Sequence, residues 1–157
     1  MSKLQLSLQK SLRLENVLKY KVLLDEEDVN LDVIIEQMQS YINVKGSDQI
    51  GPLIQYTRTF FNEENELDME IVMMLQCSHY IHNVEPPYHM DSLLRVKNCM
   101  YCRYIGPEES AKFVYDKINL EAFEQDIKLK GDSYTIYVDE QDDHMVIDVF
   151  MERTEDE

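Results

Sequence analysis

The 157-residue sequence predicts an α+β fold in which a β-α-β-β unit occurs twice. Three landmarks recur at an offset of 78 to 80 residues and indicate an internal duplication: Gly51 with Gly131, Asp68 with Val146, and Tyr20 with Met100. Strands that follow one another through short acidic loops, without a ladder of alternating helices, favour a mainly antiparallel sheet. Two copies are too few for a solenoid. We therefore expect one pseudo-symmetric domain with a cleft between its halves.

The first unit begins with a strand from Val17 to Leu24. Asp28 or Asn30 can cap the helix that follows, and Gly46 closes it. Two strands, 52–61 and 67–76, are joined by an acidic loop and should form an antiparallel pair. The helix is predicted from one apolar stripe at i, i+3, i+4, i+7 and i+11, made of Leu31, Ile34, Ile35, Met38 and Ile42.

The second unit repeats this order after a break that contains Pro86-Pro87. Its first strand spans 93–105, and Gly106-Pro107-Glu108-Glu109 is a suitable helix start, with proline at a permissive first position. Strands 132–139 and 144–152 close the unit. The helix stripe consists of Ala111, Val114, Tyr115, Ile118 and Ala122.

The first fourteen residues lie outside the repeat. Leu4, Leu6 and Leu8 alternate with polar residues there, which indicates an added edge strand or an arm with a possible role in partner binding. The expected organisation is an N-terminal arm or extra strand at 1–14, one domain at 15–153 (repeat one 16–76, linker 77–92, repeat two 93–153) and an acidic tail at 154–157.

Composition excludes several classes of function. The chain carries 15 basic and 31 acidic residues, a net charge of −16, so a nucleic-acid partner is not expected because phosphate binding needs basic residues. No apolar run reaches the ~18 residues of a membrane helix, and the start of the sequence lacks the apolar core of a signal peptide. We expect a cytoplasmic protein without a membrane partner. The acidic loops are best interpreted as solvated segments that maintain solubility.

The three cysteines do not form a disulfide framework, because their number is odd. Cys99 and Cys102 have CxxC spacing, but within a strand residues three apart point to opposite faces. We expect core cysteines rather than redox chemistry. Cys77, His79, His82 and His89 lack the paired spacing of a zinc site, so we predict neither a metal nor another cofactor.

Local sequence and element order together resemble the GyrI-like small-molecule-binding domains, the effector-binding domains of multidrug-responsive bacterial regulators. The resemblance covers about residues 15 to 153. It rests on Met100-Tyr101-Cys102-Arg103-Tyr104-Ile105-Gly106-Pro107, and on the hairpin formed by Tyr134-Thr135-Ile136-Tyr137-Val138 and Val146-Ile147-Asp148-Val149-Phe150. The apolar-Pro-apolar turn that often ends the family's closing strand is missing here. The chain resembles a stand-alone branch of the family.

The resemblance implies a curved eight-stranded sheet with two helices on one face and a groove at the pseudo-twofold axis. It also implies that aromatic rings and a strand carboxylate line this groove and bind lipophilic, often cationic, molecules. Asp148 matches the acid of the family, and Glu70 is its counterpart in the first repeat. Asp148 is equally well interpreted as a structural acid bonded to a neighbouring residue. The candidate ligand-binding residues are Tyr56, Glu70, Tyr101, Tyr104, Tyr137, Asp148 and Phe150.

The predicted function is non-catalytic binding of a small lipophilic ligand, expected to be cationic, between the repeats. For each tyrosine, simple packing of the sheet is the alternative interpretation. Two other functions stay open: an interaction or adaptor protein for a polypeptide such as a toxin, gyrase or a secreted cargo, and a small hydrolase with Glu70 as a base. No nucleophile motif or phosphate-binding loop supports an enzyme.

Overall fold

The computed structural model describes residues 3–23, 30–141 and 143–154. Its fold is α+β, as predicted, with six antiparallel strands and two α-helices among these residues. The sheet closes into a barrel in the order β1-β3-β2-β5-β6-β4. The elements are β1 (Lys3–Val22), α1 (Leu31–Val44), β2 (Gln49–Phe61), β3 (Leu67–Cys77), β4 (Tyr88–Gly106), a 3-10 turn η1 (Glu108–Ser110), α2 (Phe113–Glu124), β5 (Asp132–Gln141) and β6 (His144–Glu152).

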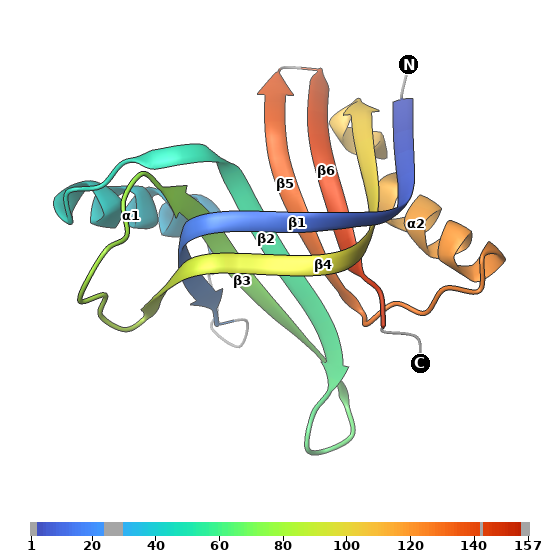
Figure 1. Ribbon diagram of the computed structural model, residues 1–157, viewed down its shortest axis with the longest axis horizontal. Coiled ribbons are helices and arrows are strands. Elements are labelled where there is room, and N and C mark those ends of the chain that lie inside the picture. The colour runs from blue at the N-terminus through green and yellow to red at the C-terminus, as the bar shows by residue number, and fades with distance from the viewer. Residues whose placement is uncertain (1–2, 24–29, 142, 155–157) are drawn as a thin grey trace.

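The count of six strands corrects the expected eight, within the described part of the chain. β1 and β4 are 20 and 19 residues long and pair along most of their length, from Lys3 with Ile105 to Tyr20 with Tyr88. Each therefore serves both halves of the sheet: β1 also pairs with β3, and β4 also pairs with β6. In Figure 1 the two strands cross the front of the molecule side by side, from the half that holds α1 to the half that holds α2.

Each half keeps the β-α-β-β order that the sequence predicts, β1-α1-β2-β3 and then β4-α2-β5-β6. Gly51 and Gly131, which occupy equivalent positions in the two predicted repeats, both have positive φ, +79° and +95°. Glycine adopts this backbone conformation without the steric cost that a Cβ would add. A common origin of the two halves stays a prediction.

The helices pack where their apolar stripes predicted. Asn30 caps α1, because its Oδ1 accepts hydrogen bonds from the backbone N–H groups of Asp32 and Val33; Asp28, the other candidate cap, lies outside the described residues. Met38 and Ile42 are fully buried against the sheet. In the second half, Pro107 leads into η1 and α2 begins only at Phe113, later than the Gly-Pro start indicated. Val114, Ile118 and Ala122 are the buried residues of α2.

Three apolar clusters form the core. The α1 cluster lies between α1 and the sheet and includes Met38, Ile42, Met73 and Leu75. The α2 cluster includes Val114, Ile118, Cys102 and Tyr104. The third, called here the inner cluster, lies on the opposite face of the sheet and consists of Leu12, Leu14, Val17, Ile54, Met74, Val96, Cys99, Tyr101, Tyr134 and Phe150. Both helices thus cover one face, and Figure 1 shows them apart, α1 at the left and α2 at the right of the molecule.

The cysteine prediction is confirmed. Cys77, Cys99 and Cys102 are fully buried free thiols. Cys99 belongs to the inner cluster and Cys102 to the α2 cluster, so the two CxxC thiols lie on opposite faces of the sheet. Neither helix in the described residues has the length and apolar character needed to cross a membrane.

Candidate functional site

Asp148, the matched family acid, lies in a hydrogen-bonded ion pair. It is 9% exposed on β6, directly opposite Arg103 of β4. The guanidinium group binds it through two contacts, Nε to Oδ1 at 2.7 Å and Nη2 to Oδ2 at 2.9 Å. The hydroxyl of Tyr101 donates a third hydrogen bond to Oδ1, at 2.8 Å. Such two-pronged contacts are among the strongest that a carboxylate makes. The negative charge of Asp148 is therefore already compensated within the chain.

The ionisation states of the partners follow from this geometry. Burial, followed by the hydrogen bond to Asp148, raises the pKa of Tyr101 to about 12, so its hydroxyl stays protonated and can donate. The hydrogen bond to Asp148 is the main cause that raises the pKa of Arg103 above its ordinary value. Arg103 remains a cation under all physiological conditions. We call Tyr101, Arg103 and Asp148 the Asp148 network.

Four aromatic rings continue from this network across neighbouring strands. Tyr101 and Phe150 are directly paired, with ring centroids 4.9 Å apart. Phe150 pairs in turn with Tyr134 of β5, and the rings of Tyr134 and Tyr56 are 4.7 Å apart. Tilted contacts at these distances are favourable for aromatic rings. The row forms much of the inner cluster and gives that side of the sheet a large polarisable surface.

A lysine of the chain covers one of these rings. Lys10 Nζ lies 4.0 Å from the centroid of the Tyr101 ring. An ammonium ion within about 6 Å of a ring face is attracted by the ring quadrupole. The hydroxyl of the same ring donates to a carboxylate, which increases the electron density that the cation meets. This end of the inner cluster is therefore electrostatically suited to a cation.

Asp132 lies at the other end of the aromatic row. Its Oδ2 accepts a hydrogen bond from the Tyr56 hydroxyl at 3.3 Å, and its Oδ1 accepts one from the backbone N–H of Glu152 at 3.3 Å. Burial, and next the charge of Glu152, raise the pKa of the Asp132 carboxyl. Burial and then Asp132 raise the pKa of Tyr56 to about 12. Among the described residues, these two hydrogen bonds of Asp132 come from a hydroxyl and a backbone amide, whereas Asp148 is bound by a guanidinium group.

Glu70, the counterpart of Asp148, is more open to solvent. Its Oε2 lies 3.1 Å from Lys21 Nζ and 3.7 Å from Arg58 Nη2, and its side chain is 20% exposed. It borders a hollow of about 260 Å³, which is lined by Lys21, Val22, Leu23, Phe60, Asp68, Met69 and Glu70. Both candidate acids are thus paired with basic side chains of neighbouring strands.

The other two candidate residues lie on the helix-covered face. Tyr104 belongs to the α2 cluster, and its hydroxyl donates to the backbone carbonyl of Pro107. Tyr137 also packs against that cluster, and its hydroxyl donates to Gln55 Oε1 at 3.5 Å. The sheet therefore separates the predicted set. Tyr56, Tyr101 and Phe150 lie together with Asp148, whereas Tyr104 and Tyr137 do not.

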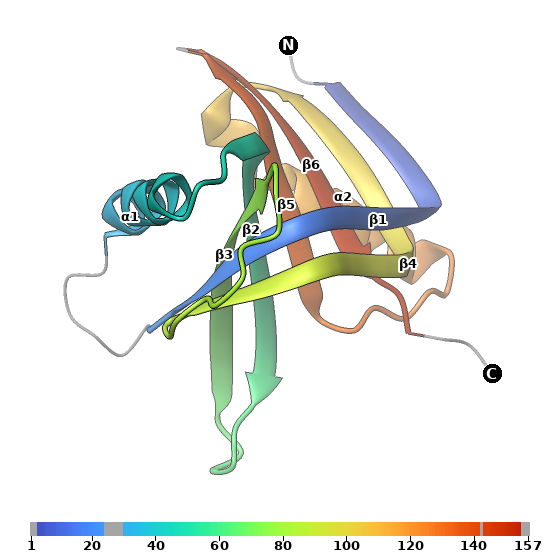
Figure 2. The same ribbon diagram turned by 60° about the vertical axis from the view of Figure 1, so that its left-hand side comes forward.

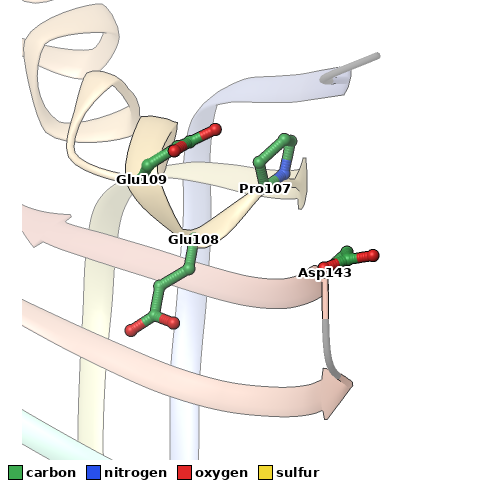
Figure 3. A pocket seen from close by; sticks show the side chains of 4 residues that line it. All are labelled: Pro107, Glu108, Glu109 and Asp143. Carbon is green, nitrogen blue, oxygen red and sulfur yellow. The ribbon is translucent and has the colours of Figure 1, made fainter.

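Two of the other hollows have linings of mixed polar and apolar character. One of about 300 Å³ lies on the α2 side and is lined by Thr57, Thr59, Tyr115, Asn119, Leu129, Gly131, Asp132, Ser133 and Met151. The other, of about 640 Å³, is lined by Pro107, Glu108, Glu109 and Asp143. Figure 3 shows its three carboxylates pointing in different directions rather than converging on one point. Within the described residues, no three His, Cys, Asp or Glu side chains are grouped closely enough to hold a metal ion.

Sequence reasoning missed Arg103 and Lys10 as members of the site. Arg103 follows Tyr101 at an alternate position and so shares its strand face, a signal that was available. Its contact with Asp148 depends on the β4–β6 register, which places the two residues opposite each other. Lys10 comes from the segment that lay outside the repeat, and no pattern within the repeat points to it.

Comparisons with known proteins leave the family open. No family model matches the sequence, and no curated protein matches it. Among solved structures, the fold is similar to the 1.81 Å crystal structure of a Staphylococcus aureus MU50 protein provisionally assigned to bacterial transcription regulation. The similarity covers 99% of both chains, with a TM-score of 0.44 and 8% identity. A likeness at this level establishes neither family nor function.

Proposed function

We propose that this protein is a non-catalytic binding domain for a small lipophilic molecule that carries a positive charge. The ligand binds at the Tyr101 end of the inner cluster, between the two halves of the chain. The charged group of the ligand contacts the Tyr101 ring, and the apolar part of the ligand extends toward Phe150. This proposal keeps the function that the GyrI-like resemblance implies and assigns it to one end of the cluster.

The position of Lys10 is the observation that carries the proposal. Lys10 is an exposed residue of β1, yet its ammonium group lies 4.0 Å from the Tyr101 centroid. A flexible surface lysine is a weakly held occupant, since such contacts contribute only about 0.5–1 kcal/mol at exposed sites. A ligand cation with apolar groups can replace it and gain burial of its own surface in addition. A ligand cation can therefore take the place of the Lys10 ammonium group on the face of the Tyr101 ring.

Asp148 acts indirectly in this proposal. Because Arg103 already neutralises it, the carboxylate orients the Tyr101 hydroxyl and makes the ring a better cation acceptor. It does not need to contact the ligand. Glu70 lies at the other half, paired with Lys21 and Arg58, and is not part of this site.

The test is a thermal-shift titration with lipophilic quaternary ammonium compounds, neutral isosteres of the same shape, and matched anions. Binding to the native state alone raises stability by about 2.7 kcal/mol at a hundredfold excess over Kd. We expect a rise in Tm for the cations only, which Tyr101→Leu abolishes and Tyr101→Phe merely weakens. Glu70→Gln serves as the distant control and should leave the response unchanged. Equal shifts with cations and neutral isosteres would refute the charge recognition, and the absence of any shift would refute the site.

A protein partner is the second candidate, and a different observation favours it. The β2–β3 hairpin projects from the barrel in Figures 1 and 2. Phe61 and Leu67, a directly opposed pair near its tip, are 69% and 70% exposed. Adjacent exposed apolar side chains favour a contact surface more than a single exposed residue does, because interaction sites are contiguous apolar patches. Phe61→Ser should eliminate binding to such a partner and leave the cation response intact, whereas Tyr101→Leu should do the reverse.

A further inference from the structure

The N-terminal part of β1 has one side without a neighbouring strand. Residues 3–15 pair with β4, and only the later segment, Val17 to Val22, also pairs with β3. Within residues 3–23, 30–141 and 143–154, no other strand pairs with this segment. Figure 2 shows it at the margin of the sheet beside β4. Alternate N–H and C=O groups of a strand point away from its one partner, so this edge can accept another strand.

The sequence of this edge is complementary to itself. It reads Lys-Leu-Gln-Leu-Ser-Leu-Gln-Lys from position 3 to position 10. In an antiparallel pairing of two copies centred on Leu6, each Leu4 meets a Leu8 and each Leu6 meets its own equivalent. On the other strand face, Gln5 meets Ser7. Directly opposed side chains are close enough to pack in such a ladder, so this register joins leucines with leucines and polar groups with polar groups.

The exposure of the leucines fits the same arrangement. Leu6 packs against the α2 cluster, while Leu4 and Leu8 remain 40% and 37% exposed. Two copies related by a two-fold axis at Leu6 would cover all four exposed leucines at once. A contact of one surface patch with itself is the usual basis of a symmetric dimer.

Charge also selects this edge. The chain has a net charge of −16, but residues 1–14 contain no acid and carry Lys3, Lys10 and Arg13. The strip that would form the contact therefore carries no negative charge of its own, unlike most of this acidic chain. The β1–β4 register shifts between Ser7 and Lys10 and again between Lys10 and Leu12. A bulge of this kind limits strand addition, so the contact is confined to about residues 3–9.

We infer that two copies of this chain associate in solution through β1, antiparallel about a two-fold axis at Leu6, so that one sheet continues from one copy into the other. The occupant of the edge is a second copy because the register of leucines is symmetric about one residue. The association does not depend on the ligand proposed above. It should be reversible, since the contact strip is short relative to a standard stable interface.

Sedimentation velocity over a range of protein concentrations tests this association. The wild-type chain should form a dimer as its concentration rises, and more completely at high salt, because screening weakens repulsion between two acidic molecules. Leu4→Lys combined with Leu8→Lys should leave it monomeric at every concentration. Val138→Lys combined with Val44→Lys, at exposed positions on β5 and α1, adds the same two charges and should leave the dimer intact. A wild-type chain that is monomeric throughout the series overturns the inference and leaves the edge to a strand of another protein.

A cross-linking experiment tests the register itself. Leu6→Cys should give a disulfide-linked dimer under mild oxidation, because residue 6 faces its own equivalent across the axis. Leu4→Cys should not, since its equivalent is four residues along the strand, roughly 13 Å away, whereas a disulfide requires Cα atoms within about 7 Å. The native thiols cannot interfere, as Cys77, Cys99 and Cys102 are fully buried. A dimer that cross-links through Leu4→Cys and not through Leu6→Cys contradicts the proposed register.

Discussion

The Lys10 ammonium group lies over the Tyr101 ring while the Tyr101 hydroxyl donates to Asp148. One ring thus joins a basic residue of β1 to an acidic residue of β6. In this position Lys10 competes with any external cation for the face of the ring. Its removal should therefore strengthen ligand binding, an effect opposite to that expected for a residue that contacts a ligand directly.

We expect Lys10→Ala to increase the affinity for lipophilic cations by about 2- to 30-fold, which corresponds to the ~0.5–2 kcal/mol of a cation–π contact. Isothermal titration calorimetry measures the change. Lys3→Ala, on the same strand and exposed, removes the same charge without touching the ring and is the matched control. Equal gains for both variants would assign the effect to net charge rather than to the contact with Tyr101.

The Arg103–Asp148 pair should contribute measurably to the free energy of unfolding. Arg103→Met leaves a largely buried carboxylate with only the Tyr101 hydroxyl, so we expect a loss of about 1–3 kcal/mol. Adding Asp148→Asn should restore part of this loss, because the uncompensated charge is then gone. Urea denaturation of the wild type, both single variants and the double variant gives the coupling energy. The exposed Arg13–Glu15 pair serves as comparison, with an expected coupling of at most ~1 kcal/mol. Additive losses at Arg103 and Asp148 would contradict a direct pair.

Asp132 should make stability depend on pH. Burial and then Glu152 raise the pKa of this carboxyl in the folded state. For an acid whose folded-state pKa is raised, the associated stability is fully present below the unfolded-state pKa and is lost as the pH rises through the folded-state pKa. At neutral pH the ionised carboxylate therefore carries a cost. Asparagine removes that charge and retains an acceptor oxygen for the Tyr56 hydroxyl or the Glu152 amide.

Asp132→Asn should accordingly raise Tm at neutral pH. The expected rise is about 2–4 °C for each kcal/mol that the free energy of unfolding gains when the buried charge is removed. The difference from the wild type should shrink as the pH falls and the wild-type carboxyl becomes protonated. Asp116→Asn, at an exposed position on α2, loses one negative charge without relieving burial and should change Tm little. A stabilisation by Asp132→Asn that persists in acid would mean that the hydrogen bonds, and not the charge, are responsible.

The cysteines should be chemically silent in the native protein. Burial is the main cause that raises the pKa of the Cys99 thiol to about 12, and burial also raises the pKa of Cys77 and Cys102. Thiolates, which are the reactive form, are thus disfavoured at all three positions. A chromogenic disulfide reagent should react with none of them in buffer and with all three in denaturant. Rapid reaction of one thiol in the native state would show local opening of its strand.

Sequence patterns located most of the elements because the relevant forces are local. The apolar stripe from Leu31 to Ile42 predicted the buried face of α1, and the side chain of Asn30 supplies its cap. Strand alternation placed Cys99 and Cys102 on opposite faces before any contact was known. The same alternation, applied to the candidate ligand-binding residues, separates Tyr101 from Tyr104 because they are three positions apart on one strand. Their side chains do lie on different sides of the sheet.

Long-range features did not follow from local patterns. Whether the first strand includes residues 3–14 depends on their pairing with β4, and the partners of these residues are 80 to 102 positions away, from Leu14 with Leu94 to Lys3 with Ile105. The pairing of Asp148 with Arg103 likewise depends on register, which a local pattern leaves undetermined. Asp148 could be interpreted as a groove acid or as a bonded structural acid, and the choice between them requires its neighbour on β4, Arg103, to be known. The contacts favour a bonded acid beside the aromatic row.

The shared strands also determine how the chain can be divided. Because β1 and β4 each supply backbone partners to both halves, a cut in the segment between β3 and β4 produces two fragments, each of which lacks a strand that the other holds. Neither fragment should retain its structure when purified, yet the two should reassemble when mixed. The unit that evolution can exchange, delete or fuse is therefore the whole barrel, even though each half has its own helix and its own hairpin.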